Sequence, residues 1–206
     1  MGLYGRYILP HVLDCACGLP AVERERARLV PRARGHVLEI GIGTGRNLAH
    51  YDPANIDTIV GLDPTADMHP RTRRRAAEAG LSVALMAFGA EQIPADDDQF
   101  DTVLVTYSLC SIPEPHTALR EMRRVLKPDG ALLFCEHGRS PEPKVARWQQ
   151  RLTPAWRHIA GGCHLDRDVP ALLADAGLIV DTLDTGYIPG PKPLTWHFRG
   201  RALKTS

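Results

Sequence analysis

Short apolar runs alternate with amphipathic stretches along most of the 206-residue chain. Apolar runs occupy residues 36–42, 57–63, 82–88, 101–109 and 131–138. Their continuous Val, Leu and Ile content is typical of strands that are buried on both faces. Helical patterns lie between them at 66–80 and 113–130, and a further helix is predicted to begin near Arg46. This alternation predicts an α/β fold built from β-α-β units around a parallel sheet.

The helical patterns carry their own boundary signals. In the first, Asp67 is a plausible N-terminal cap and Gly80 is a stop. In the second, one helical stripe collects the apolar residues Ala118, Leu119, Met122, Val125 and Leu126. Residues 128–130, Pro-Asp-Gly, break that pattern, so we expect the helix to end before them.

The C-terminal third begins with a different pattern. Residues 141–160 are predicted to form an irregular, aromatic-bearing insertion that Trp148 and Trp156 anchor. A short helix over 167–177 is expected to end at Gly177. Two further strands, at 178–190 and 194–205, are predicted to pair in antiparallel fashion.

Residues 20–35 form a charged helical segment ahead of the first strand. One interpretation is a solvated helix that packs across the sheet edge, and the other is a lid over a bound cofactor. The sequence leaves both open.

Charge and composition exclude several classes of protein. The formal net charge of +1 gives no reason to expect a nucleic-acid partner. No apolar run approaches the ~20 residues of a membrane helix, so we predict no transmembrane segment. The five cysteines have no C-x-x-C spacing, which argues against a disulfide framework, and we expect Cys110 and Cys135 to be buried thiols. A cytoplasmic location is the simplest expectation.

A glycine-rich turn, with Gly41, Gly43 and Gly45, follows the first strand. Dinucleotide-binding proteins use the spacing G-x-G-x-x-G to bring a pyrophosphate to a helix N-terminus. Here the spacing is G-x-G-x-G, and Glu39 would repel a pyrophosphate but attract an ammonium group. Asp63, at the end of the second strand, can accept hydrogen bonds from a ribose in either cofactor class. The turn therefore favours a phosphate-free cofactor with an amino acid end, while a nicotinamide-dependent oxidoreductase stays open.

The segments "GAEQIP", "DDDQFDTVLVTYSLCSI" and "ALREMRRVLKPDGALLFCEHG" follow this turn in order. Over about residues 35–140, the chain resembles class I S-adenosylmethionine-dependent methyltransferases. The resemblance implies a doubly wound, Rossmann-like sheet of seven strands, mostly parallel with an antiparallel seventh strand. It also implies S-adenosyl-L-methionine as cofactor and S-adenosyl-L-homocysteine as product.

The same resemblance assigns roles to residues of the turn and the strand ends. Glu39 and Gly41 would face the methionine end of the cofactor, while Gly43 and Gly45 would allow close backbone approach. Asp63 would bind the ribose.

Further residues would surround the adenosine and the donor methyl. Pro64 and Met68 would pack near the ribose or adenine, and Thr106 would face the donor site. Gly89 stands where the family often has an acidic residue for the adenine amino group, so the contacts there would come from Ala90 and Glu91.

A narrower resemblance comes from "SLCSI", "EHG" and "WQQRLTPAWRHIAGGCHLDRD". These segments are similar to the methyltransferase-like thiol S-methyltransferases and their small bacterial relatives, which implies a small, apolar thiol as methyl acceptor. The animal members carry an apolar N-terminal anchor that this sequence lacks. We therefore expect a soluble bacterial-type member, for which peripheral membrane contact remains open and no oligomeric state is predicted.

Other functions stay open beside thiol methylation. The same core would serve a lipid amine N-methyltransferase or a quinone C-methyltransferase. More remote possibilities are a nicotinamide-dependent oxidoreductase and a catalytically silent cofactor-binding protein.

A thiol acceptor attacks as a thiolate, so a nearby base or positive field would help. His137 follows the fifth predicted strand, and His164 and Asp166 lie in the following insertion, so each is a candidate base or thiolate stabiliser. Simple packing or loop-ordering roles are the alternatives for both histidines, and Cys163 is either a reactive thiol or a packed residue. We predict no metal site, because the adjacent residues Cys163 and His164 cannot easily share one tetrahedral ion.

No linker, internal repeat or low-complexity tract divides the chain. We predict one domain over 1–206, with an N-terminal helical segment at 1–34. The cofactor-binding core would span 35–140, and the acceptor-side insertion with the C-terminal strands would span 141–206.

Overall fold

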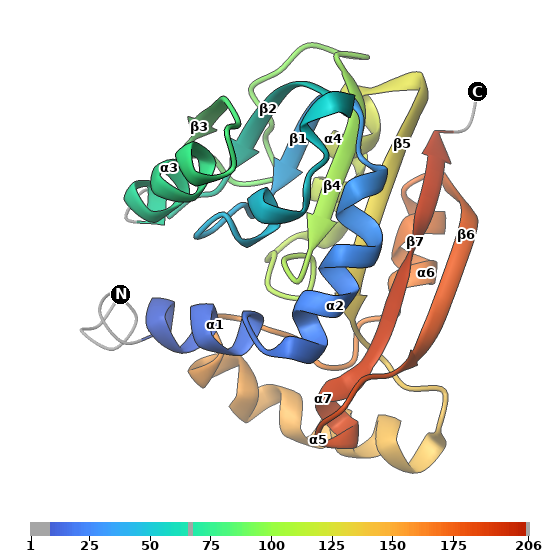
Figure 1. Cartoon of the computed structure of the whole chain (residues 1–206). Coiled ribbons are helices and arrows are strands. Elements are labelled where there is room, and N and C mark those ends of the chain that lie inside the picture. The colour runs from blue at the N-terminus through green and yellow to red at the C-terminus, as the bar shows by residue number, and fades with distance from the viewer. Residues whose placement is uncertain (1–8, 66–67, 205–206) are drawn as a thin grey trace.

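The computed structural model describes residues 9–65 and 68–204. Its seven strands form one sheet in the order β3-β2-β1-β4-β5-β7-β6 (Figure 1). The strands are β1 (Gly35–Ile40), β2 (Ile56–Leu62), β3 (Val83–Met86), β4 (Phe100–Thr106), β5 (Leu126–His137), β6 (Leu178–Tyr187) and β7 (Trp196–Lys204). This architecture confirms the predicted seven-strand α/β fold.

Strand direction also agrees with the prediction. The pairs β1–β2, β1–β4, β2–β3 and β4–β5 are parallel, whereas β7 runs antiparallel to both β5 and β6. The order reverses beside β1, because the chain moves outward to β2 and β3 and then returns to place β4 on the other side. Open α/β sheets bind ligands at such a switch point, outside the carboxyl ends of the strands.

Helices cover both faces of the sheet. On one face, α4 (Pro115–Val125) and α6 (Val169–Asp175) bury apolar side chains against the sheet, among them Leu119, Met122 and Leu173. On the other face, α3 (His69–Glu78) and the segment after α2 (Pro20–Leu29) contribute Ala76 and Val30 to a second core. Burial on both faces explains the continuous apolar runs of the central strands.

Two predicted elements have a different form. The segment that begins at Arg46 is a short 3-10 helix (Arg46–His50), and Gly45 before it is left-handed with a φ of 78°. The predicted irregular insertion at 141–160 contains a regular 17-residue helix, α5 (Pro143–Ile159). The proposed cap Asp67 lies outside the described residues.

The two tryptophans of the insertion differ in their burial. Trp156 packs against a small apolar cluster of Cys110, Ala160, Cys163 and Leu165. Trp148 is instead 56% exposed, so the prediction that both tryptophans anchor the insertion is wrong for this residue.

The N-terminal part of the chain forms α1 (Leu9–Cys17) and then α2, which Figure 1 shows crossing the sheet in front of β4 and β5. A short helix, α7 (Lys192–Thr195), precedes β7. In the part of the chain described, no helix combines the length and apolar character needed to cross a membrane.

Strand β7 can pack closely between β5 and β6 because residue 200 is a glycine. A Cβ at this position would lie 2.2 Å from the carbonyl oxygen of Thr182 and 2.7 Å from the ring of Phe134. We predict that Gly200→Ala lowers the free energy of unfolding by roughly 1–3 kcal/mol, as overpacking does, measured by urea denaturation.

Gly186→Ala, in the neighbouring strand β6, is the matched control. A Cβ there would meet no described atom within 4 Å, so we expect little change or a slight gain in stability. Equal destabilisation by both substitutions would contradict this account of the packing.

Candidate functional site

A cavity of about 320 Å³ lies at the carboxyl ends of β1, β2 and β4. Nine of the ten predicted cofactor-binding residues line it: Glu39, Gly41, Gly43, Asp63, Pro64, Met68, Ala90, Glu91 and Thr106. Gly45 lies off the wall, where a Cβ would come within 2.7 Å of Leu48 and 3.0 Å of Thr72. Residues from four separate segments thus meet at the switch point, although their individual roles remain predictions.

The glycine turn forms the floor of the cavity. Gly41 has a φ of 65°, and a Cβ there would lie 2.1 Å from the Ser108 hydroxyl oxygen. Gly43 has a φ of 51°, and its carbonyl oxygen accepts a hydrogen bond of 2.6 Å from the Thr72 hydroxyl. The left-handed backbone explains why glycine stands at both positions, and the close approach of Ser108 is a second reason at Gly41.

Glu39, the penultimate residue of β1, is a buried carboxyl with only 2% exposure. One oxygen accepts a 2.9 Å hydrogen bond from Asn47 Nδ2, and the other accepts a 2.8 Å bond from the Tyr51 hydroxyl. Burial raises the pKa of Glu39 to about 7, even though both hydrogen bonds favour the charged form. At neutral pH this carboxyl is therefore poised between its two protonation states.

Arg26 enters the cavity from α2, and sequence reasoning missed it. Its Nη1 donates to Asn47 Oδ1 at 2.6 Å and to Thr106 Oγ1 at 2.8 Å, while its Nε has no described hydrogen-bond partner. The guanidinium carbon lies 4.9 Å from the centroid of the Tyr107 ring. A buried cation with spare donors beside a cavity is suited to an anionic ligand group.

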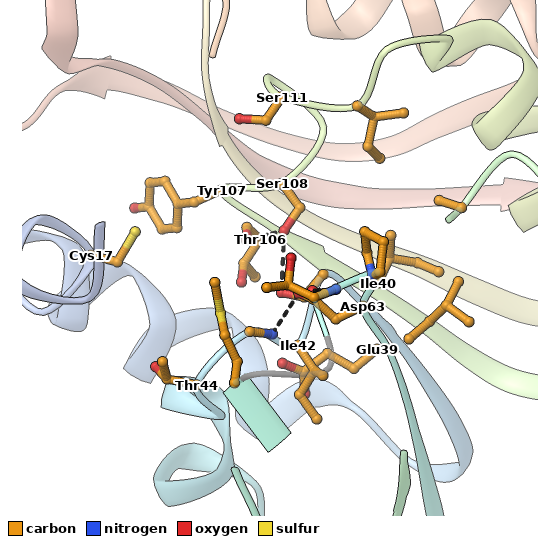
Figure 2. Close-up of a pocket in the computed structure, with 18 of the residues that line it drawn as sticks. Cys17, Glu39, Ile40, Ile42, Thr44, Asp63, Thr106, Tyr107, Ser108 and Ser111 are labelled. Carbon is orange, nitrogen blue, oxygen red and sulfur yellow. Dashed lines mark hydrogen bonds between the residues drawn. The ribbon is translucent and has the colours of Figure 1, made fainter. Parts of the chain in front are cut away.

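Asp63 follows β2 and lies on the cavity wall (Figure 2). Its Oδ2 accepts from Gly43 N at 3.0 Å, and its Oδ1 accepts from Thr65 N at 2.7 Å. These backbone donors hold the carboxylate in place, and each oxygen retains further accepting capacity.

The loop after β4 forms the facing wall. It contains Tyr107, whose φ of 52° is left-handed, followed by Ser108 and Ser111, and Figure 2 shows all three around the cavity. Glu136 supports the loop from behind, since its Oε1 accepts from Ser108 N at 2.8 Å and Leu109 N at 3.0 Å. Burial raises the pKa of Glu136 to about 8.

The N-terminal helices contribute more than a solvated surface. Asp14 and Cys17 of α1 line the cavity together with Arg26 of α2. Asp14 accepts hydrogen bonds from Thr44 Oγ1 at 2.6 Å and Arg46 Nε at 2.9 Å, which join α1 to the glycine turn. The predicted segment at 20–35 therefore packs across the sheet through α2, and its Arg26 also reaches the cavity. Nothing in the charged sequence around Arg26 distinguishes this buried arginine from its exposed neighbours.

The three predicted catalytic residues lie off the cavity wall in the described part of the chain. His137 is half-buried, with its Nε2 3.2 Å from Cys163 Sγ. Asp166 Oδ1 accepts a 3.3 Å hydrogen bond from the Thr153 hydroxyl and lies 4.0 Å from His164 Nδ1. Burial and the charge of Arg167 lower the pKa of His164. The insertion reaches the cavity instead through Gly161.

The cavity's charges fit S-adenosylmethionine better than a dinucleotide. A carboxyl and a guanidinium lie at one end, where an ammonium and a carboxylate can each find an opposite charge. A second carboxylate, Asp63, lies across the turn at a suitable place for ribose hydroxyls. A pyrophosphate at this floor would face Glu39 directly.

Comparison with known proteins agrees with this assessment. A family model described as "Methyltransferase domain" matches residues 38–134. The thiol S-methyltransferase TMT1B of Rattus norvegicus is 34% identical over 176 residues, covering 82% of this chain and 70% of that protein. Phosphatidylethanolamine N-methyltransferase of Cereibacter sphaeroides is 29% identical over 159 residues, covering 76% of each chain.

Solved structures show the same fold. Geranyl diphosphate methyltransferase in complex with SAM aligns with a TM-score of 0.70 at 15% identity, covering 95% of this chain and 87% of that one. At this identity the likeness concerns the fold alone.

The raised pKa of Glu39 predicts that the free energy of unfolding of the cofactor-free protein depends on pH. The folded state holds this proton more tightly than the unfolded chain, so the stabilisation is complete below pH 4.5 and is lost as the pH rises to about 7. Between these limits, we expect the stability of Glu39→Gln relative to the unsubstituted protein to rise by roughly 1–3 kcal/mol. Urea unfolding across this pH range measures the difference.

Glu78→Gln, on an exposed part of α3, controls for the loss of one negative charge. A constant difference between Glu39→Gln and the unsubstituted protein at every pH would contradict the assigned protonation behaviour.

Proposed function

This chain belongs to the class I S-adenosylmethionine-dependent methyltransferases, and on that premise we propose that it methylates the sulfur of a small apolar thiol. Its cofactor is S-adenosyl-L-methionine. One observation carries the site assignment: Glu39, Arg26 and Asp63 line the same cavity at the sheet's switch point. The choice of sulfur is supported by similarity to a thiol S-methyltransferase over 82% of this chain.

We propose that the amino acid end of the cofactor binds between Glu39 and Arg26. The Glu39 carboxylate would accept from the ammonium, and the spare donors of Arg26 would bind the carboxylate. Asn47 ties the two ends of this arrangement together, since it donates to Glu39 and accepts from Arg26. Such a preset network reduces the ordering that binding would otherwise require.

The adenosine would extend across the glycine turn. Asp63 would accept hydrogen bonds from the ribose hydroxyls, with Pro64 and Met68 packed beside the sugar or base. Ala90 and Glu91 lie on the wall near the adenine end, beside Gly89. Gly45 would affect cofactor binding indirectly, because the absence of a side chain allows the turn to pack against Leu48 and Thr72.

The bound cofactor supplies an electrophilic methyl group on a sulfonium, and the protein's task is alignment. Thr106, Tyr107 and Ser111 would shape the side of the cavity from which the acceptor sulfur approaches. Holding two reactants in line can lower the activation free energy by roughly 7–11 kcal/mol. Exclusion of water by a partly apolar wall, with Ile112 and Pro113, would strengthen the electrostatic interactions inside the cavity.

We propose that His137, His164 and Asp166 support the acceptor wall from behind. His164 N donates to the Cys110 carbonyl at 2.9 Å, which joins the insertion to the loop after β4. Asp166 accepts from Thr153 of α5. Acting through this wall would make them positioning residues, so their removal should change the KM for the acceptor more than the affinity for the cofactor.

Methylation of a lipid amine is the second candidate. It is favoured by the similarity to phosphatidylethanolamine N-methyltransferase over 76% of this chain. Quinone carbon methylation would use the same core.

A methyl-acceptor assay with labelled S-adenosylmethionine separates these functions. We expect saturable transfer to a simple alkyl thiol and none to an ethanolamine lipid or a quinol. Transfer to the amine or quinol with none to thiols would overturn the proposed acceptor. Cofactor binding without transfer to any of them would indicate a silent binding protein, and binding of NAD(H) in its place would reject the site assignment.

The orientation of the cofactor can be tested with two ligands. Arg26→Gln should weaken binding of S-adenosylhomocysteine by about fivefold or more, equivalent to ~1 kcal/mol for a charged hydrogen bond. The same variant should leave the affinity for methylthioadenosine unchanged, because this ligand lacks the amino acid end. Asp63→Ala should weaken both ligands. Isothermal titration calorimetry measures all four affinities.

Asp57→Ala, at the exposed start of β2, is the control for Asp63. If Arg26→Gln weakened both ligands equally, the proposed orientation would be wrong.

A further inference from the structure

Three potential metal ligands from distant parts of the sequence meet beside the cavity. Cys110 lies in the loop after β4, His137 ends β5, and Cys163 lies between α5 and α6. One ligand atom from each residue lies within 4.8 Å of the other two. Cys163 Sγ and His137 Nε2 are 3.2 Å apart. We call these three residues the thiol–imidazole cluster.

The donor atoms of this cluster suit a borderline-soft transition metal. Thiolate sulfur and imidazole nitrogen are the usual ligands of protein-bound zinc. Around a tetrahedral zinc ion, bond lengths of about 2.3 Å to sulfur and 2.0–2.1 Å to nitrogen separate ligand atoms by about 3.6–3.8 Å. The observed spacing in the cluster can reach that geometry through small side-chain movements.

The surroundings also favour metal binding. Cys110 is 4% exposed and Cys163 is 9% exposed, so the two thiols are shielded from bulk solvent.

Two further buried polar groups lie near the cluster. The rings of His197 and His137 have centroids 6.4 Å apart, and His197 Nε2 is buried without a described hydrogen-bond partner. Glu136, next to His137, has one buried oxygen that also lacks a described partner. Native proteins rarely leave buried polar atoms unpaired in this way.

We propose that Cys110, His137 and Cys163 form a zinc-binding site. The metal would tie the insertion that follows α5 to the loop after β4 and to the end of β5. Ser111 lines the cavity and its hydroxyl lies 3.5 Å from Cys110 Sγ, so the metal would sit one side chain behind the acceptor wall. Three protein ligands leave the fourth position for water or another exchangeable group.

This site revises the sequence-based prediction that the chain holds no metal. That prediction considered Cys163 together with its neighbour His164, which cannot easily share one ion. The fold instead pairs Cys163 with Cys110 and His137, which lie 53 and 26 positions away in the sequence. The proposal does not depend on which acceptor is methylated.

Direct metal binding is the test, using the full chain without an affinity tag, fully reduced and treated with a chelator. We expect one equivalent of added zinc to bind and to raise the melting temperature by roughly 5 °C or more at saturating metal. Cobalt(II) should give the strong visible absorption of a tetrahedral site together with thiolate-to-cobalt charge transfer in the near ultraviolet.

Matched cysteine variants locate the ligands. Cys110→Ser, Cys163→Ser and His137→Ala should each remove the cobalt spectrum or weaken zinc binding by at least tenfold. Cys135→Ser, at an equally buried thiol outside the cluster, should retain both. If a ligand variant fails to fold, the cobalt spectrum of the unsubstituted protein still reports whether thiolates bind the metal.

Several results would overturn the proposal. They are the absence of stoichiometric zinc binding by the reduced, folded protein, a cobalt spectrum without thiolate charge transfer, and binding that survives in Cys163→Ser. A Cys110–Cys163 disulfide that persists under reducing conditions would do the same.

Discussion

A buried network of opposite charges at the switch point of the sheet holds the site together. Arg26 from α2, Asn47 after the glycine turn and Thr106 at the end of β4 form one set of hydrogen bonds, and Glu39 at the end of β1 joins it through Asn47. Burying a charge without a partner is expensive, so each member depends on the others. The network therefore couples the N-terminal helices to the strand ends that form the cavity.

The same network explains why a stable resting protein can still bind a charged cofactor. A carboxyl with a pKa of about 7 can remain partly protonated in the protein without bound cofactor. An arriving ammonium would favour the charged form and convert a local cost into binding energy. In the free protein, burial makes the charged form of Glu39 unfavourable, and the ammonium of the ligand would offset this penalty.

The sequence predicted the sheet well because its signals are local. Continuous apolar runs identified the central strands, and the glycine turn with Glu39 and Asp63 identified one wall of the cavity. Arg26 could not be found in this way, because a buried arginine in a charged helix looks the same in sequence as its exposed neighbours. The helix α5 was also missed, since the apolar cluster against which Trp156 packs comes from separate segments.

Long-range geometry accounts for the remaining differences. His137 and Cys163 were each considered beside their sequence neighbours, whereas the fold brings them to each other and to Cys110. Strand ends and the loops after them meet only when the sheet is assembled, so spacing in the sequence carries little information about such groups.

The central claim is that Glu39 binds the cofactor's ammonium as a carboxylate. Calorimetric titration of S-adenosylhomocysteine at pH 7, in two buffers with different ionisation enthalpies, tests it directly. Because burial raises the pKa of Glu39 to about 7 in the free protein, binding at this pH should release a fraction of a proton. Glu39→Gln should abolish that release. Binding with no proton release, or the same release in Glu39→Gln, would contradict the account.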